Sequence, residues 1–208
     1  MQINAEKLGP LESHHLLRNL VMPRPIALVS TVNHEGRVNV APFSFYGVVS
    51  VLPPLLGIAI GRRQGKEKDT IINIRKTGEL VINLASESMA EKINIAAMDF
   101  PPEESEVEPA GFSTRSAVAV RPPLIADSPA QMECTVKEIL KFGQDQGAHD
   151  YVIAEAVVFH INDDLWKNDL PDCLGMNVLG RLGDDYYQGV REPFEMKRLK
   201  YTEWRRKK

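Results

Sequence analysis

The sequence predicts a mainly β protein, an antiparallel barrel that is closed or partly open and carries a few peripheral helices. Three observations predict this fold. Short apolar, β-branched or alternating runs recur along the chain and are typical of strands. Helical spacing and capping signals are concentrated in two stretches near the middle of the chain. Strands and helices seldom alternate, which argues against a doubly wound parallel sheet.

The first third of the chain predicts a hairpin and a buried strand. The prolines at 23 and 25 interrupt any helix there, because proline lacks a backbone donor and restricts the residue before it. The expected elements are a short helical turn at 11–20, strands at 26–32 and 37–41 around the turn at 33–36, an extended segment at 43–51 and a buried strand at 55–60.

The rest of the chain predicts two helices and three more strands. Gly78 has the position of a glycine that ends the first helix, and Ser88 to Glu91 has the form of a capping box that begins the second. The expected elements are helices from Asp69 to about 76 and from 88 to about 98, a solvated acidic loop at 101–109, a weakly extended stretch at 111–120, and strands at 79–85, 131–141 and 151–161.

Composition excludes several classes of protein. The 208 residues carry a net charge of −3, which argues against nucleic-acid binding, and 43% of them are apolar. The sequence contains no apolar run of membrane-spanning length and no secretory signal pattern. Cys134 and Cys173 lie far apart, so we expect no disulfide scaffold and no metal site, and a cytoplasmic location. We expect one domain over residues 1–208, with solvated charge in the basic tail at 204–208.

Two stretches are candidates for a binding site. Residues 39–47 place Ser44 between Phe43 and Phe45, and such residues could border a flat polar ring. Residues 68–70 begin a helix, whose N-terminus attracts phosphate. From the residues alone, an ordinary core strand and a solvated helix start remain the alternatives. His149, which precedes a strong strand, could contact a ligand or lie on the surface.

Several familiar catalytic motifs are absent. The sequence contains neither GxSxG nor a GxGxxG that begins a helix, so neither a serine hydrolase elbow nor a Rossmann cofactor site is predicted. The other histidines lack the spacing of metal ligands. A redox cofactor would therefore need a different phosphate contact.

The chain resembles the flavin reductase-like family, and within it the flavoredoxin-like subgroup, over about residues 20–190. The resemblance rests on segments that follow one another in this order: RPIALVST, NVAPFSFYG, PPLLGIAI, KDTIINI, GELVINLAS and GRLGDDYY. It implies a Greek-key split β-barrel that binds FMN as a homodimer. The terminal extensions would then be dimer or surface elements.

The resemblance also implies roles for individual residues. The isoalloxazine ring and ribityl chain would run along Asn39, Ala41, Pro42, Phe43, Ser44 and Phe45. The phosphate would contact Lys68, Asp69 and Thr70, with Arg62 as a further contact, and Ser30 and Thr31 would line the flavin tail. His149 matches a histidine associated with the nicotinamide, although Ala148 replaces the aspartate expected before it.

The resulting hypothesis is an NAD(P)H:FMN oxidoreductase in which NADH or NADPH is the electron donor and no side chain is an essential acid or base. The first alternative is an FMN-binding electron carrier that a redox protein partner reduces. The second is a non-catalytic protein that binds flavin or haem on a similar barrel.

Overall fold

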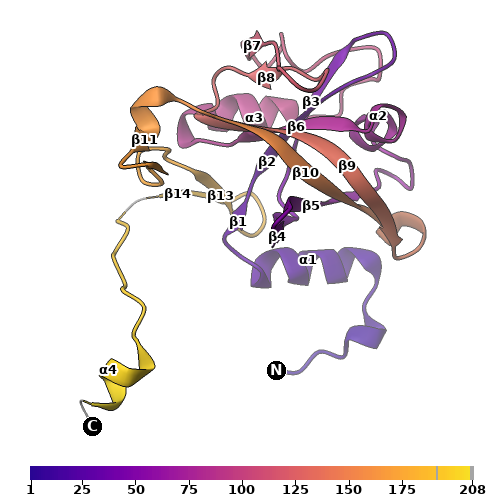
Figure 1. Ribbon diagram of the computed structural model, residues 1–208. Helices are drawn as coiled ribbons and strands as arrows, with labels where there is room; N and C mark the ends of the chain where they lie inside the picture. The colour runs from indigo at the N-terminus through magenta and orange to yellow at the C-terminus, as the bar shows by residue number, and fades with distance from the viewer. Residues whose placement is uncertain (191, 207–208) are drawn as a thin grey trace.

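The computed structural model describes residues 1–190 and 192–206. Its centre is a curled sheet of seven strands in the spatial order β3-β2-β6-β9-β10-β5-β4 (Figure 1). Every neighbouring pair in this sheet is antiparallel. The predicted mainly β, antiparallel fold is therefore confirmed.

The central strands are β2 (Ala27–Val32), β3 (Val38–Phe43), β4 (Tyr46–Val51), β5 (Pro54–Gly61), β6 (Glu79–Leu84), β9 (Ala130–Phe142) and β10 (His149–Ile161). A second sheet contains β1 (Arg24–Pro25), β13 (Leu179–Arg181) and β14 (Tyr187–Gly189). Two small ladders pair β7 (Thr114–Arg115) with β8 (Leu124–Ile125) and β11 (Trp166–Lys167) with β12 (Leu170–Pro171). The α-helices are α1 (Pro10–Leu20), α2 (Asp69–Thr77), α3 (Ala90–Ala96) and α4 (Tyr201–Arg205). Short 3₁₀ helices are η1 (Ala5–Lys7), η2 (Glu87–Met89), η3 (Asp145–Gly147) and η4 (Asp163–Leu165).

The curl of the sheet follows from one short connection. Strands β3 and β4 are the two edges of the sheet, yet only Ser44 and Phe45 separate them in sequence. One residue extends the chain by at most about 3.6 Å, so the two edges must meet at this end. The Phe45 carbonyl also accepts a hydrogen bond from the Ala59 N–H of β5 at 2.8 Å. The described residues of β3 and β4 do not pair with each other, so the barrel is split along this line.

The core explains why these segments form strands. Strand β2 is buried along its whole length, as its continuous apolar and hydroxyl run predicts. Inside the barrel, β2, β5, β6 and β10 contribute the main cluster, which α2 covers with Ile71 and Ile74. Gly78 ends α2 with φ of 69°, a left-handed conformation that glycine adopts without steric cost. The predicted end of this helix is therefore confirmed.

Two local predictions were wrong. Helix α3 begins at Ala90 without a side-chain cap, because η2 precedes it and the Ser88 hydroxyl instead contacts the Ser86 hydroxyl at 2.9 Å. The acidic loop is only partly solvated, because Glu106 is buried and its Oε2 accepts a hydrogen bond from the Val40 N–H at 2.8 Å. That carboxylate satisfies a backbone donor on β3, which is a sheet edge.

The pKa of Glu106 is raised, mainly by burial, although its backbone hydrogen bonds lower it. Between the ordinary glutamate pKa of about 4.3 and the raised one, the folded state holds more protons than the unfolded state, so stability falls as pH rises. The uncharged amide of Glu106→Gln should therefore gain stability relative to the parent protein as pH rises from about 4 to 7. Urea midpoints across this range, with the exposed Glu103→Gln as control, test this. A difference in urea midpoint between Glu106→Gln and the parent protein that stays constant from about pH 4 to pH 7 would contradict this expectation.

The two cysteines differ in exposure. Cys134 lies in the core, and burial, together with the neighbouring Glu133 charge, raises its pKa to about 12, whereas Cys173 is exposed. Because the thiolate is the reactive form, we expect only Cys173 to react quickly with a disulfide reagent at pH 8 in the native protein. Labelling before and after unfolding measures this, and Cys173→Ser should remove the fast phase. Fast labelling of that variant would show that Cys134 is accessible.

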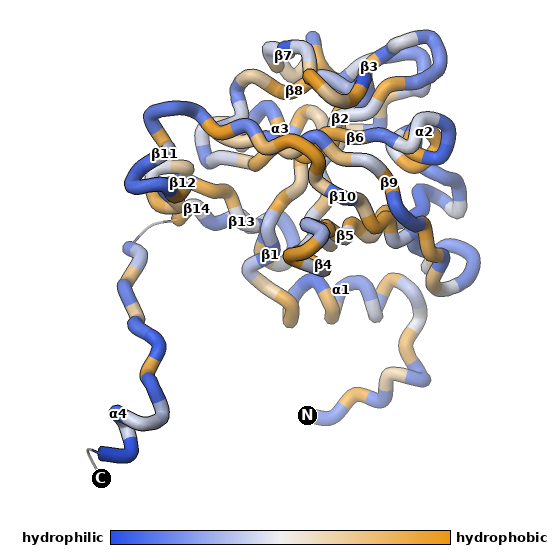
Figure 2. The backbone as a smooth tube through the Cα atoms, viewed as in Figure 1, coloured by the Kyte–Doolittle hydropathy of each residue, from blue (hydrophilic) through white to orange (hydrophobic). Residues whose placement is uncertain are grey.

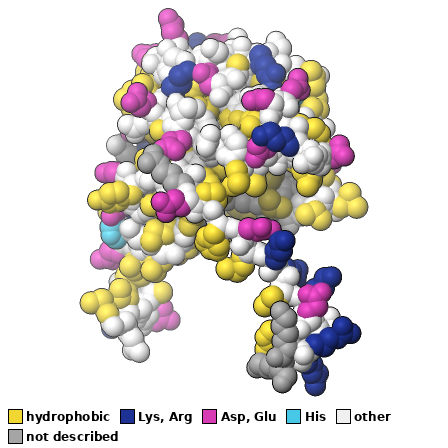
Figure 3. Space-filling model, turned by 90° about the vertical axis from the view of Figure 1, so that its left-hand side faces the viewer, with side chains coloured by type: hydrophobic (Ala, Val, Ile, Leu, Met, Phe, Trp, Pro, Cys, Tyr) yellow, Lys and Arg dark blue, Asp and Glu magenta, His cyan; other side chains and the backbone are white. Residues whose placement is uncertain are grey.

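The chain leaves the body after β14 and forms an arm over residues 192–206 (Figure 1). This arm is mostly hydrophilic (Figure 2), and dark blue basic side chains gather toward its end (Figure 3). Of the predicted basic tail, Lys207 and Lys208 lie outside the described residues. No helix in the described part of the chain is both long and apolar enough to cross a membrane.

Candidate functional site

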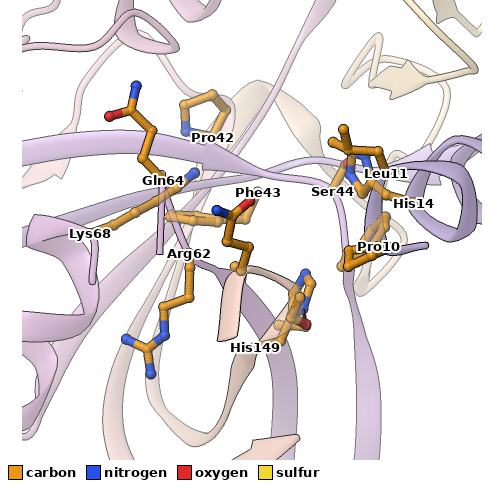
Figure 4. A pocket seen from close by; sticks show the side chains of 15 residues that line it. Pro10, Leu11, His14, Pro42, Phe43, Ser44, Arg62, Gln64, Lys68 and His149 are labelled. Carbon is orange, nitrogen blue, oxygen red and sulfur yellow. Dashed lines mark hydrogen bonds between the residues drawn. The ribbon is translucent and has the colours of Figure 1, made fainter. Parts of the chain in front are cut away.

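A groove of about 450 Å³ lies where β3 passes into β4, the place at which the two edges of the sheet meet (Figure 4). Its walls come from α1, the junction at residues 42–45, the end of β5, the start of α2 and the start of β10. The predicted site residues that line it are Pro42, Phe43, Ser44, Phe45, Arg62, Lys68 and His149. The fold thus brings together residues far apart in the sequence.

One side of the groove is a stack of flat rings. The rings of Phe45 and His149 are nearly parallel, with an angle of 18° and centroids 6.0 Å apart, and His14 of α1 lies 5.9 Å from Phe45. The Nδ1 of His149 is 3.0 Å from the Gly147 carbonyl, which can only accept, so Nδ1 carries a proton. In the neutral ring, Nε2 is then an acceptor. Gly61 leaves space for this ring, since a Cβ there would lie 3.0 Å from Nε2.

Lys68 provides positive charge in the groove. It is the N-cap residue of α2, and its Nζ lies 5.5 Å from the centre of the Phe43 ring. The pKa of Lys68 is lowered because the side chain is largely buried and because Arg63 is also positive. Within the described part of the chain, no carboxylate forms an ion pair with it. A half-buried ammonium beside an aromatic ring is suited to bind an anion.

Arg62 lines the same groove, but its charge is already compensated. Its guanidinium contacts Asp150 at 2.8 Å and Glu67 at 2.7 Å, and it points away from Lys68 (Figure 4). Arg75 of α2 pairs with the same two carboxylates. Asp150 is fully buried, so this ion-pair network joins α2, β5 and β10 beneath the groove. The first role of Arg62 is therefore to stabilise this part of the fold.

The other predicted site residues do not line the groove. Asn39 donates to the Thr70 hydroxyl at 3.0 Å, and with Asp69 it lines a separate pocket of about 250 Å³. Thr31 is buried and accepts a hydrogen bond from Asn73 at 3.1 Å. Ser30 donates to Pro123, and Ala41 packs against the main core. These residues support the walls at residues 42–45 and 68.

Sequence reasoning missed the contribution of α1. Pro10, Leu11 and His14 of this helix line the groove, although the N-terminal extension was expected to be a dimer or surface element. The pKa of His14 is lowered, mainly by burial and then by the charge of Arg18. The spacing of residues 11, 14 and 18 places them on one face of a helix, and this was the available signal.

Comparison with known proteins gives a consistent result. The family described as "Flavin reductase like domain" matches residues 17–174. An uncharacterized protein of Halalkalibacterium halodurans is 37% identical over 201 residues, which cover 95% of this chain and 96% of that protein. An uncharacterized protein of Bacillus subtilis is 35% identical over 196 residues, which cover 92% of this chain and 96% of that protein.

Solved structures agree with this. Nitrilotriacetate monooxygenase component B from Bacillus cereus superposes with a TM-score of 0.90 at 31% identity, covering 94% of this chain and 98% of that one. The 2-nitrobenzoate 2-nitroreductase of Pseudomonas fluorescens gives a TM-score of 0.87 at 28% identity, covering 97% and 98%. The flavoredoxin of Desulfovibrio vulgaris, with a TM-score of 0.73 at 18% identity over 88% of this chain and 94% of that one, shows the same fold.

Proposed function

Because this chain belongs to the flavin reductase-like family, a family of flavin oxidoreductases, we propose that it binds FMN and is reduced by NADH or NADPH before passing the electrons to an acceptor. The observation that carries the choice of a phosphorylated flavin is the position of Lys68. Lys68 places a positive charge at a groove with aromatic walls, and no carboxylate among the described residues pairs with it.

The residues of the groove fit such a ligand. A volume of about 450 Å³ lies within the range of roughly 300–1,000 Å³ that is common for ligand pockets. The rings of Phe45 and His149 offer flat surfaces to an aromatic ligand. The Ser44 hydroxyl accepts a hydrogen bond from Arg24 at 3.3 Å, which leaves its own proton free for an acceptor atom of the ring.

When bound, FMN supplies the chemistry, because its ring accepts a hydride and gives up electrons. The protein's residues bind and orient it. Lys68 would hold the phosphate and so fix the position of the cofactor along the groove. Ser44 and the backbone at residues 42–45 would bind the polar edge of the ring. His149, with Nδ1 held by Gly147, keeps its ring orientation and presents Nε2 to the second substrate.

Stopped-flow absorbance tests this function. Flavin-loaded protein mixed anaerobically with NADH or NADPH should lose its flavin absorption within seconds, and oxygen or another acceptor should restore it. Fluorescence quenching should show FMN binding at micromolar concentration. A protein that does not quench FMN fluorescence would contradict the proposal.

One observation favours a second function, that of an FMN electron carrier. The buried Ala148 stands where the resemblance predicts an aspartate, so the residue before His149 offers no carboxylate that could orient the ring toward a nicotinamide. In a carrier, neither dinucleotide would reduce the bound flavin rapidly, whereas dithionite would. Rapid reduction by either dinucleotide excludes this alternative.

A further inference from the structure

A second cavity, of about 340 Å³, adjoins the groove and shares its wall at residues 42–45. We call it the arginine pocket, because Arg18 of α1, Arg24 of β1 and Arg181 of β13 line it. Lys68 lines both cavities. No acidic side chain is among the described residues that line the arginine pocket. Two adjacent elements near the N-terminus, α1 and β1, and the distant strand β13 thus direct positive charge to one place.

Arg24 is the most deeply buried of these cations, with 5% of its surface exposed. It donates to the carbonyls of Arg18, Val21 and Leu182 and to the Ser44 hydroxyl, all of which are neutral acceptors. Within the described residues it forms no ion pair. Burial, together with the neighbouring Arg181 and Arg18, lowers its pKa. A buried charge of this kind is unfavourable unless an anion lies close to it.

The charges of the other two arginines are themselves only partly compensated by carboxylates. Arg18 pairs with Asp184 at 2.7 Å, but its Nε is a buried donor with no hydrogen-bond partner among the described residues. Arg181 stacks on the Tyr187 ring at 4.2 Å, and it forms a long ion pair of 3.8 Å with Asp185, whose side chain is fully exposed. Solvent screens such an exposed pair strongly. The pocket therefore retains positive charge and an unused donor.

The fitting occupant carries more than one negative charge and several acceptor oxygens. A single carboxylate would leave most of the charge unpaired, whereas guanidinium groups bind phosphate oxygens in pairs. Because the two cavities share a wall, the occupant should belong to a molecule that also reaches the groove. We propose that the arginine pocket binds the diphosphate of the nicotinamide dinucleotide whose ring enters the groove. This inference rests on the function proposed above.

Calorimetry with ADP tests the pocket without any redox reaction, since ADP carries the diphosphate and no nicotinamide. FMN-loaded protein should bind ADP and should bind adenosine far more weakly. Arg18→Gln should weaken ADP binding at least 10-fold, and Arg181→Gln should do the same if the first variant fails to fold. Arg37→Gln removes the charge of an arginine on the far hairpin, which is paired with Glu35, and should leave ADP binding unchanged.

A kinetic comparison separates this inference from the proposed function. Arg18→Gln should slow flavin reduction by NADH and NADPH at low donor concentration, but not reduction by the uncharged donor 1-benzyl-1,4-dihydronicotinamide. Equal ADP affinity in the parent protein and in Arg18→Gln would overturn the inference. The inference would also be overturned if Arg18→Gln weakened the binding of FMN but not that of riboflavin, because the pocket would then hold the flavin phosphate. If ADP binding depends on Arg18 but neither dinucleotide reduces the flavin, the proposed function fails.

Discussion

Replacing Lys68 with alanine should weaken FMN binding by about 10- to 100-fold and change riboflavin binding little. A charge-assisted contact to phosphate is worth about 1.5–3 kcal/mol, and 1.4 kcal/mol corresponds to a factor of ten in affinity. Lys68 qualifies for such a contact because it is half-buried and has no carboxylate partner within the described chain. Riboflavin lacks the phosphate, so the ratio of the two dissociation constants isolates this contact.

Lys66→Ala is the matched control for this experiment. Lys66 lies in the same loop and is exposed, and its backbone pairs with Arg63. Removing its side chain should change FMN affinity less than about twofold, because salt and water screen an exposed charge. Fluorescence titration of both flavins against the three proteins gives the answer. An equal loss of FMN and riboflavin binding in Lys68→Ala would show that the lysine supports the groove without contacting phosphate.

The strands and the junction at residues 42–45 could be predicted because their signals are local. An apolar and β-branched run predicts β2, and alternation predicts β9, whatever the rest of the chain does. The junction could be predicted as a candidate site because polar and aromatic residues are interleaved there. Its second property, that it joins the two edges of the sheet, depends on strand order, which no local pattern encodes.

The charged parts of the site could not be predicted in the same way. Arg18 meets Asp184 and Arg24 meets Leu182 across most of the length of the chain. The sequence suggests neither partner, because a charged residue in isolation is usually solvated. The ion-pair partners of Arg62, a residue for which a phosphate contact is predicted, could not be predicted for the same reason. Its buried partner Asp150 is the second residue of β10, which pairs with β5, so the contact exists only once the sheet has formed.

The ion-pair network beneath the groove leads to a large expected effect on stability. Asp150→Asn should lower the free energy of unfolding by about 3 kcal/mol, because removing one member of a buried ion pair leaves the other charge uncompensated. Asp150 is fully buried, and the Arg62 side chain is 7% exposed. Glu67 also contacts Arg62 and would still compensate part of its charge in the variant. The expected loss of stability is therefore at the low end of the range for buried ion pairs. Urea unfolding at neutral pH measures it.

The ion pair of the exposed Lys137 with the partly exposed Glu155, also on the central sheet, provides the control. Lys137→Met should change stability by less than about 1 kcal/mol, because solvent screens that pair. A loss equally small in Asp150→Asn would mean that Glu67 alone compensates Arg62.

The position of Asp150 next to His149 raises the question of whether the network also shapes the groove. A ligand that binds only the folded state adds stability according to its affinity and concentration. If Asp150→Asn unfolds more easily but gains the same stability from saturating FMN as the parent protein, the network supports the sheet and leaves the binding surface unchanged. A smaller gain would show that Arg62, once released from Asp150, disturbs the groove that it lines.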